Sequence, residues 1–196
     1  MSGITRTNTL LLVGLSDPAN QAAWSEFDER YRPIVLRFAR RLGMHEAEAQ
    51  DAAQDTLLHV VRDFRAGKFD RSRGRLRSWL FAIARSHVLG RRRSTARRHE
   101  VRGDSALEEV ADDATLTKFF EEEWHREILR TALHELRTTT RSDPQTVRAF
   151  ELVVIEERPA PEVARELGLS LNTVYVAKHR TLERLRSILE RLREDF

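Results

Sequence analysis

The sequence predicts an all-α protein with two small helical domains joined by a flexible linker, the second of which contains a helix-turn-helix. Apolar residues recur mostly at intervals of three and four, and alternating β-branched runs bounded by turns are absent. After residue 90 a basic block and then an acidic block follow, with few large apolar residues. Near the C-terminus, Gly168 interrupts a stretch that is otherwise rich in helix formers.

The composition favours a nucleic-acid-binding protein over an enzyme. With 196 residues, of which 40% are hydrophobic, the chain can form one domain or two small ones around a buried core. Its 34 basic residues are nearly all arginine, which binds phosphate and guanine through paired hydrogen bonds, although the net charge is only +3. The seven histidines lack the spacing of metal ligands, and cysteine is absent. Without a phosphate-binding glycine loop or a nucleophile elbow, we expect no catalytic residue, no metal and no cofactor.

The N-terminal apolar run, TLLLVGL, is too short to cross a bilayer and lacks a small-residue cleavage site. The lack of cysteine also fits a reducing compartment. We therefore expect a cytoplasmic protein without a signal peptide or a membrane-bound segment.

A first helix is expected to begin at Ser16-Asp17-Pro18, a capping signal with proline in the first turn. Pro33 should break or kink this helix, because proline removes a backbone hydrogen bond and clashes with the preceding turn. Gly43 should end it. Its apolar face consists of Trp24, Phe27, Tyr31, Val35, Phe38 and Leu42.

Two further helices are expected over residues 45–64 and 76–92, connected by the glycine-punctuated basic loop RAGKFDRSRGR. Apolar residues at helical spacing mark their buried faces, which are Ala49, Ala53, Leu57, Val60, Val61 and Phe64 in one, and Trp79, Leu80, Ile83, Ala84 and Val88 in the other. We assign residues 16–93 to the first domain and residues 94–115, where the basic block turns acidic, to the linker.

Residues 116–196 form the second predicted domain. It begins with the amphipathic stretch LTKFFEEEWHREILRTALHEL. Ser142-Asp143-Pro144 then repeats the capping signal and is expected to open a helix that continues through Val154.

The stretch RPAPEVARELGLSLNTVYVAKHR is best explained as two helices with a turn between them. Pro161 lies in the first turn of the first helix, where its missing N–H costs little, and Gly168 supplies a left-handed cap. Ser170 can cap the second helix, whose Val174 should face the core. This pattern predicts a helix-turn-helix, whose second helix enters the major groove of DNA, with an ordinary helical hairpin as the alternative.

Residues 62–98 carry thirteen basic side chains against two acidic ones. A block of one sign repels itself unless a polyanion binds to it. Phe69, Trp79 and Phe81 are interleaved with the arginines, and this combination suits single-stranded nucleic acid, whose bases stack on aromatic rings. Core packing is the alternative for Trp79 and Phe81.

The second expected helix carries an acidic face. Glu48, Asp51 and Asp55 are three and four residues apart, so they share one face, and Gln54 lies among them. Such a face fits a metal site, an acid/base pair or a protein-docking surface. A metal site is disfavoured because no matching ligand cluster stands elsewhere in the chain. No basic residue that obviously neutralises the face is near.

Both halves of the chain resemble one family. The resemblance is carried by the segment WSEFDERYRPIVLRFARRLGMHEAEAQDAAQDTLLHVVRDF, by the segment FDRSRGRLRSWLFAIARSHVLGRRR and by the terminal helix-turn-helix. These segments resemble extracytoplasmic-function (ECF) sigma factors, the small sigma subunits of bacterial RNA polymerase. The resemblance covers about residues 24–93 and 127–192.

The resemblance implies a protein that binds core RNA polymerase and directs it to specific promoters. It implies that the first domain docks on the polymerase through Glu48, Asp51, Gln54 and Asp55. The basic loop and the helix after it would hold melted −10 promoter DNA through Phe69, Arg71, Ser72, Arg73, Arg75, Arg77 and Arg85. The second helix of the helix-turn-helix would bind duplex −35 DNA through Ser170, Asn172, Thr173, Tyr175, Val176, Lys178, His179 and Arg180.

An anti-sigma factor is a possible further partner, and catalysis is left to the polymerase. Ser86 and Gly90 depart from the family, which commonly has asparagine and often an acidic residue at these places; the departures concern the detail of −10 readout. The alternatives are a two-domain helix-turn-helix regulator that acts without polymerase and, more remotely, an enzyme acting on nucleic acid. The acidic face favours the sigma factor, because a regulator needs no docking surface.

Overall fold

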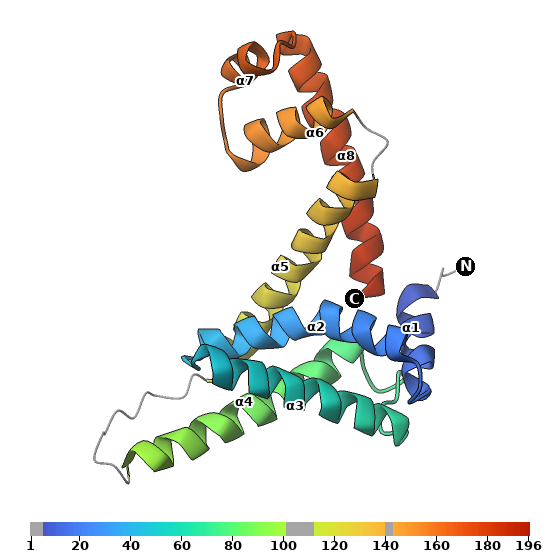
Figure 1. Ribbon diagram of the computed structural model, residues 1–196, viewed down its shortest axis with the longest axis vertical. Coiled ribbons are helices and arrows are strands. Elements are labelled where there is room, and N and C mark those ends of the chain that lie inside the picture. The colour runs from blue at the N-terminus through green and yellow to red at the C-terminus, as the bar shows by residue number, and fades with distance from the viewer. Residues whose placement is uncertain (1–5, 101–111, 140–142) are drawn as a thin grey trace. The chain divides into compact units, whose positions relative to one another are not determined.

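The computed structural model describes residues 6–100, 112–139 and 143–196 (Figure 1). The chain begins with α1 (Arg6–Ser16), α2 (Gln21–Arg41), α3 (Glu46–Arg65) and α4 (Leu76–Glu100). It continues with α5 (Asp113–Thr139), α6 (Pro144–Phe150), the π-helix η1 (Glu151–Ile155), α7 (Ala160–Leu167) and α8 (Leu171–Asp195). These ranges contain no strand, and the all-α prediction is confirmed. None of their helices is both long and apolar enough to span a membrane.

The chain divides into two compact units, and α5 contributes to both. The first unit comprises Met1–Glu127 together with Phe196, and the second comprises Ile128–Asp195. The units therefore divide inside α5 rather than at the expected linker, residues 94–115. Much of that linker, residues 101–111, lies outside the described residues.

Ser16-Asp17-Pro18 does not open a helix as expected. Ser16 is the last residue of an additional helix, α1, and Asp17 and Pro18 lie in the turn before α2. The side chain of Asn20 caps α2 instead, accepting a hydrogen bond from the backbone N–H of Ala23 at 3.0 Å. The apolar N-terminal run is part of the core, where Leu11, Leu12 and Leu15 are buried.

Pro33 does not break α2, which runs as one helix from Gln21 to Arg41. An interior proline costs about 3 kcal/mol or more. Each large apolar side chain buried by the same helix contributes about 1.5–3 kcal/mol, and the sum over the buried face outweighs that cost. This face includes Phe27, Tyr31, Ile34, Val35 and Phe38. Gly43, in the left-handed conformation with a φ of 84°, follows the end of the helix as predicted.

Helices α2, α3 and α4 pack together, with α1 against α2 and α3 (Figure 1). The predicted apolar faces of α3 and α4 are largely buried, whereas Phe64, Trp79, Phe81 and Ile83 are half-buried. Helix α4 continues beyond its expected end at Arg92 to Glu100. Arginine and alanine are strong helix formers, so the basic block extends the helix instead of beginning a flexible linker.

The first half of α5 belongs to the core of the first unit. Phe120 is buried, with its ring centroid 5.5 Å from that of Phe38 and 5.0 Å from that of Phe81. Trp124 is also buried, 5.7 Å from the ring of Tyr31. The amphipathic pattern therefore predicted the helix correctly but not the unit that buries its apolar face.

The second unit is built around a small apolar core and contains the predicted helix-turn-helix, α7 and α8. Gly168 ends α7 in the left-handed conformation with a φ of 65° and a ψ of 29°, as expected. Helix α6 begins at Pro144 and continues as η1 to Ile155, close to the predicted extent. The core is formed by Ala149, Leu152, Ala160, Val163, Ala164, Val174 and Ala177.

Candidate nucleic-acid interface and docking face

A polar seam between α3 and α4 contains the expected acidic face. The guanidinium of Arg91 on α4 lies 3.5 Å from the carboxylate of Asp51 and 2.5 Å from that of Asp55. Further along, the hydroxyl of Thr95 donates a hydrogen bond to Glu48 at 3.0 Å. The three carboxylates share one side of α3 as predicted, but each of them has a partner within the chain.

Arg91 corrects the expectation that no local basic residue neutralises this face. It lies far from Asp51 and Asp55 in sequence and reaches them only because α3 and α4 pack side by side. The pair remains partly exposed, with 35% exposure for the Arg91 side chain and 46% for Asp55. Exposed ion pairs contribute about 0.2–1 kcal/mol, so an incoming partner can replace this one at little cost.

Two neighbouring side chains complete the face. Gln54 is exposed, as the sequence predicted. Leu58, which is not among the predicted docking residues, is 49% exposed one turn after Gln54. Leu58 could have been predicted from its position beside the acidic residues of α3, because an apolar side chain next to such a stripe is typical of a protein-docking surface.

The seam continues as a pair of histidines that the sequence did not predict. His59 Nδ1 on α3 lies 2.8 Å from His87 Nε2 on α4, and His59 Nε2 lies 3.1 Å from the carboxylate of Asp63. Burial is the first cause of the lowered pKa of His87, and its interaction with His59 lowers it further, because two contacting rings resist carrying a positive charge at the same time. The pKa of Asp63 is lowered, first by the hydrogen bond that Lys68 donates to it at 3.0 Å. The bond between the two rings requires a neutral nitrogen on one of them as acceptor.

The basic loop after α3 contains Phe69, which stacks on Trp79 of α4. The rings of Phe69 and Trp79 have centroids 4.9 Å apart and planes inclined by 27°. Gly67, with a φ of 71°, provides the left-handed turn that directs the chain away from α3. Both rings are half-buried and cover each other, so a nucleobase can stack on the outer face of this pair but cannot enter between the rings without separating them.

Ser72, a predicted DNA contact, shapes the loop. Its backbone N–H and its hydroxyl both donate to one carboxylate oxygen of Asp70, at 2.8 and 2.7 Å, and the side-chain bond is the main cause of the lowered pKa of Asp70. The N–H of Arg73 donates to the Asp70 carbonyl at 3.1 Å. This turn presents Arg71, Arg73 and Arg75 at the surface, where all three side chains are exposed as predicted.

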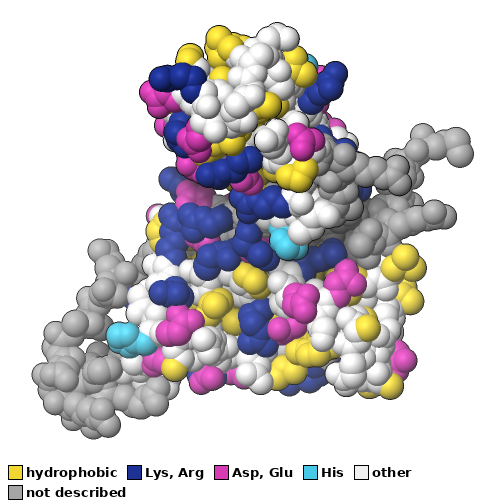
Figure 2. All heavy atoms as spheres, turned by 45° about the horizontal axis from the view of Figure 1, so that its top comes forward, with side chains coloured by type: hydrophobic (Ala, Val, Ile, Leu, Met, Phe, Trp, Pro, Cys, Tyr) yellow, Lys and Arg dark blue, Asp and Glu magenta, His cyan; other side chains and the backbone are white. Residues whose placement is uncertain are grey.

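Arg77 and Arg85, the remaining predicted −10 contacts, are engaged within the first unit. Arg77 forms an ion pair with Glu121, and Arg85 forms one with Asp113, both on α5. On the face drawn in Figure 2, acidic side chains likewise lie among the basic ones over much of the surface. The basic block of the sequence is therefore partly neutralised in the folded chain.

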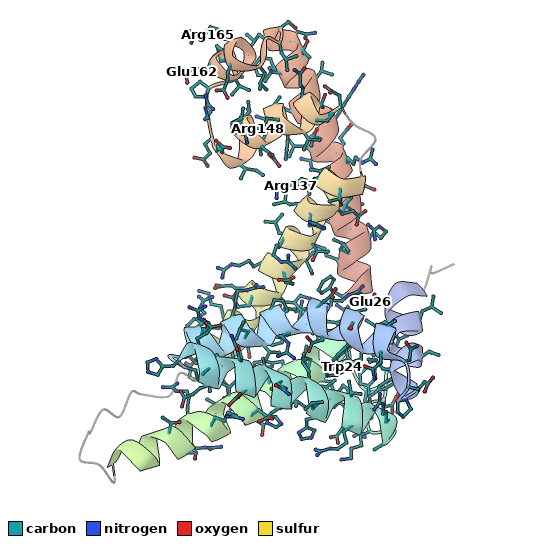
Figure 3. All side chains as sticks on the ribbon, in the orientation of Figure 1. Trp24, Glu26, Arg137, Arg148, Glu162 and Arg165 are labelled. Carbon is teal, nitrogen blue, oxygen red and sulfur yellow. The ribbon has the colours of Figure 1, made fainter. Side chains whose placement is uncertain are left out.

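The second helix of the helix-turn-helix is fixed at its start by Ser170. The hydroxyl oxygen of Ser170 accepts a hydrogen bond from the backbone N–H of Thr173 at 3.0 Å, which is the predicted cap. Val174 is fully buried in the core and sets the rotation of α8. On the preceding helix, Glu162 and Arg165 lie at the surface of α7 (Figure 3).

The rotation of α8 leaves the predicted base-reading side chains outward. Tyr175 is 52% exposed and Val176 39% exposed. Lys178 is half-buried at the edge of this surface. The exposed polar members of the predicted set are Asn172, Thr173, His179 and Arg180. Within the described ranges, no group of three or more histidine, aspartate or glutamate side chains is arranged to hold a metal ion.

These features define a helical DNA-binding protein with two units, one carrying an acidic seam and an arginine loop and the other a helix-turn-helix. Comparison with known families matches residues 27–116 to sigma-70 region 2 and residues 126–185 to sigma-70 region 4. The first match contains the seam and the loop, and the second contains α7 and the beginning of α8.

Two curated relatives match over most of the chain. The ECF RNA polymerase sigma factor SigE of Mycolicibacterium smegmatis is 26% identical over 190 residues, which cover 93% of this chain and 68% of the relative. The ECF RNA polymerase sigma factor RpoE of Cereibacter sphaeroides is 27% identical over 180 residues, which cover 90% of this chain and 91% of the relative. The chain belongs to the ECF sigma factors, polymerase-associated proteins that direct transcription from promoters.

Proposed function

We propose that the two units divide the work of promoter recognition. The first unit docks on core RNA polymerase through Glu48, Asp51, Gln54 and Asp55, and it holds the melted −10 strand with the arginine loop and the following helix. The second unit reads duplex −35 DNA with the exposed side of α8. The chain itself carries out no catalysis, works in the cytoplasm and is open to regulation by an anti-sigma factor.

The observation that carries this proposal is the presence of two different contact surfaces in one chain. The α8 surface is held by a buried valine and a serine cap, as a major-groove reader requires. The α3 surface combines carboxylates, an exposed amide and the exposed Leu58, a mixture suited to protein docking and not to DNA. A DNA-binding regulator that acts alone has no use for the second surface, so the pair of surfaces favours a polymerase subunit.

Binding of core polymerase by an Asp51→Ala, Asp55→Ala chain tests the docking assignment. Loss of a charged partner from a desolvated interface typically costs about 2–5 kcal/mol. We expect a loss of about 2 kcal/mol in binding free energy, at the lower end of this range. The reason is that Arg91 already stabilises both carboxylates in the free chain. Calorimetry or a native gel measures the affinity.

The matched control is Glu26→Ala with Asp28→Ala. These carboxylates on α2 also pair with arginines within the chain, Glu26 with Arg30 at 2.8 Å and Asp28 with Arg32 at 2.6 Å. Glu26 is labelled in Figure 3. The control should leave the affinity for polymerase unchanged. Equal affinities for the parent, the Asp51/Asp55 variant and the control would contradict the docking assignment.

A further inference from the structure

Two arginines proposed to contact −10 DNA are already bound by an acidic segment of the same chain. Arg77 pairs with Glu121 and Arg85 pairs with Asp113, and both carboxylates lie on the first half of α5. All four residues belong to the first compact unit. Both guanidinium groups are therefore engaged by carboxylates of α5, although they stay partly exposed, with 31% exposure for the Arg77 side chain and 39% for Arg85.

The same helix is anchored by aromatic packing. Phe120 is buried against the rings of Phe38 and Phe81, and the guanidinium of Arg77 lies 5.8 Å from the centroid of the Trp124 ring. Glu121 therefore stands next to an anchored aromatic residue, with its carboxylate directed at an arginine of α4. Seating Phe120 and Trp124 in the core fixes the position of the Glu121 carboxylate.

Further carboxylates of this segment bind arginines of α2. Arg37 lies 3.0 Å from Glu123 and 2.7 Å from Glu127, and both of these carboxylates are buried. Arg41 lies 2.5 Å from Glu122. Carboxylates of this segment thus pair with arginines of both α2 and α4.

The pairs differ in how readily they can be exchanged. The Arg77 and Glu121 side chains are each 31% exposed, and Asp113 is 79% exposed, so these two pairs are accessible to a competing anion. The pairs of Arg37 with Glu123 and Glu127 have buried carboxylates and are structural. In addition, Arg85 Nε is buried without a hydrogen-bond acceptor, so one donor of this guanidinium is left unsatisfied beneath the helix.

We infer that the acidic first half of α5 occupies part of the proposed −10 DNA surface in the free chain, so that Glu121 and Asp113 compete with DNA phosphates for Arg77 and Arg85. A carboxylate and a phosphate offer a guanidinium the same paired acceptor geometry, and one guanidinium edge cannot bind both at once. The inference rests on the proposed role of Arg77 and Arg85. It adds a regulatory contact, because promoter DNA must displace the two carboxylates while the aromatic anchors and the Arg37 pairs stay in place.

The test compares Glu121→Gln with Glu122→Gln in the full chain. Both changes remove one charge from the same turn of α5, but Glu122 pairs with Arg41, which has no proposed DNA role. The probe is a short fluorescein-labelled single-stranded DNA of randomised sequence, with affinity measured by anisotropy at low salt. Glu121→Gln should bind about two- to fivefold more tightly than the parent, and adding Asp113→Asn should increase this further. Glu122→Gln should bind as the parent does.

The variant Arg77→Gln shows whether a negative result contradicts the proposed competition by α5 or the proposed DNA-binding role of Arg77. If Arg77→Gln binds the probe as tightly as the parent, Arg77 does not contact DNA and the proposed −10 role is wrong. If Arg77→Gln weakens binding while Glu121→Gln binds the probe with the affinity of the parent, Arg77 contacts DNA but the proposed competition by α5 is wrong. Equal gains for Glu121→Gln and Glu122→Gln would also overturn the proposed competition, because they would reflect only the lower negative charge.

Hydrogen exchange of the unmutated chain gives an independent measurement. Adding the probe at saturating concentration should increase amide exchange over residues 113–119, which precede the first aromatic anchor, more than over the anchored residues 120–127. Unchanged or slower exchange over residues 113–119 at saturation would contradict the proposed competition.

Discussion

The two units present their proposed contact residues in opposite ways. In the first unit, Asp51 and Asp55 of the proposed docking face are paired with Arg91, and Arg77 and Arg85 of the proposed −10 surface are paired with α5. In the second unit, within the described residues, Lys178 and Arg180 have no carboxylate partner. His179 lies 3.6 Å from Glu183, and both side chains are largely exposed.

The difference predicts different responses to mutation. At its paired residues the first unit must exchange internal partners for external ones, so removing an internal partner should strengthen binding. The second unit and the arginine loop of the first unit offer their side chains directly, so removing one of them should weaken binding or change which sequence is bound. The following predictions concern these exposed side chains, then the stability of the first unit and, last, the exchange of partners.

The arginine loop should give the largest effect. Arg71→Gln, Arg73→Gln and Arg75→Gln together should reduce promoter opening by the polymerase, because three exposed cations near the melted strand are lost. At about 0.7 per single-strand phosphate contact, the log–log salt slope should fall by about 2. Permanganate reactivity of unpaired thymines reports the bubble.

The control for the loop variant replaces three arginines that lie on helices, through the substitutions Arg40→Gln, Arg126→Gln and Arg137→Gln. Each of these side chains is more than half exposed. Arg137 is labelled in Figure 3. The control should keep a normal bubble and salt slope. A normal bubble in the loop variant would refute its role in opening.

Changing a base-reading side chain of α8 should alter the free energy of −35 DNA binding by about 1–3 kcal/mol at particular base pairs. Tyr175→Ala and His179→Ala should change the preferred −35 sequence, because the two side chains are one helical turn apart on the exposed side of α8. Arg180→Ala should weaken binding evenly, as expected for a phosphate contact. Selection from a randomised −35 library measures both, and an identical preferred sequence for all three variants and the parent would show that the assignment of direct readout is wrong.

The histidine pair should make the first unit sensitive to acid. The pKa of His87 in the folded chain is lowered from 6.5, first by burial and then by its interaction with His59; Asp55 opposes this shift, and Arg91 and Arg62 add smaller lowering effects. Because the unfolded chain binds the proton more readily, the stability contributed by neutral His87 is complete above about pH 6.5 and declines as the pH falls toward the lowered pKa.

Denaturant unfolding at a series of pH values measures this dependence. His87→Gln should flatten the decline on acidification, since glutamine can still donate to His59 Nδ1 but does not titrate. His134→Gln, at an exposed position on α5, is the control and should leave the decline as it is in the parent. A decline of the same size in the His87→Gln chain would assign the acid sensitivity to other groups.

Features encoded by neighbouring residues were predictable from the sequence. Gly168 and Ser170 were sufficient to locate the turn and the cap of the helix-turn-helix, because a left-handed glycine and a serine cap act within a few residues. Val174 was sufficient to orient α8. The acidic face of α3 followed from residue spacing alone, because residues three and four apart share a helix face.

Features that depend on tertiary packing were not predictable in this way. The ion pairs of Arg91 with Asp51 and Asp55, and those of α5 with Arg77 and Arg85, join residues more than a helix length apart in sequence. Pro33 does not break α2 because the apolar face that this helix buries outweighs the local cost of proline, and that burial depends on tertiary packing. Ser16-Asp17-Pro18 lies at the end of α1, because a polar residue followed by proline suits the end of one helix as well as the start of the next.

Core-polymerase affinity in a cycle with Arg91→Gln tests most directly the claim that the first unit must exchange internal partners. The four chains are the parent, Arg91→Gln, Asp51→Ala with Asp55→Ala, and the combination of all three changes. Releasing the carboxylates should tighten binding by about 0.2–1 kcal/mol, up to about fivefold. The gain should vanish when the carboxylates are absent. Weaker binding by Arg91→Gln, or a gain that persists without Asp51 and Asp55, would contradict the account.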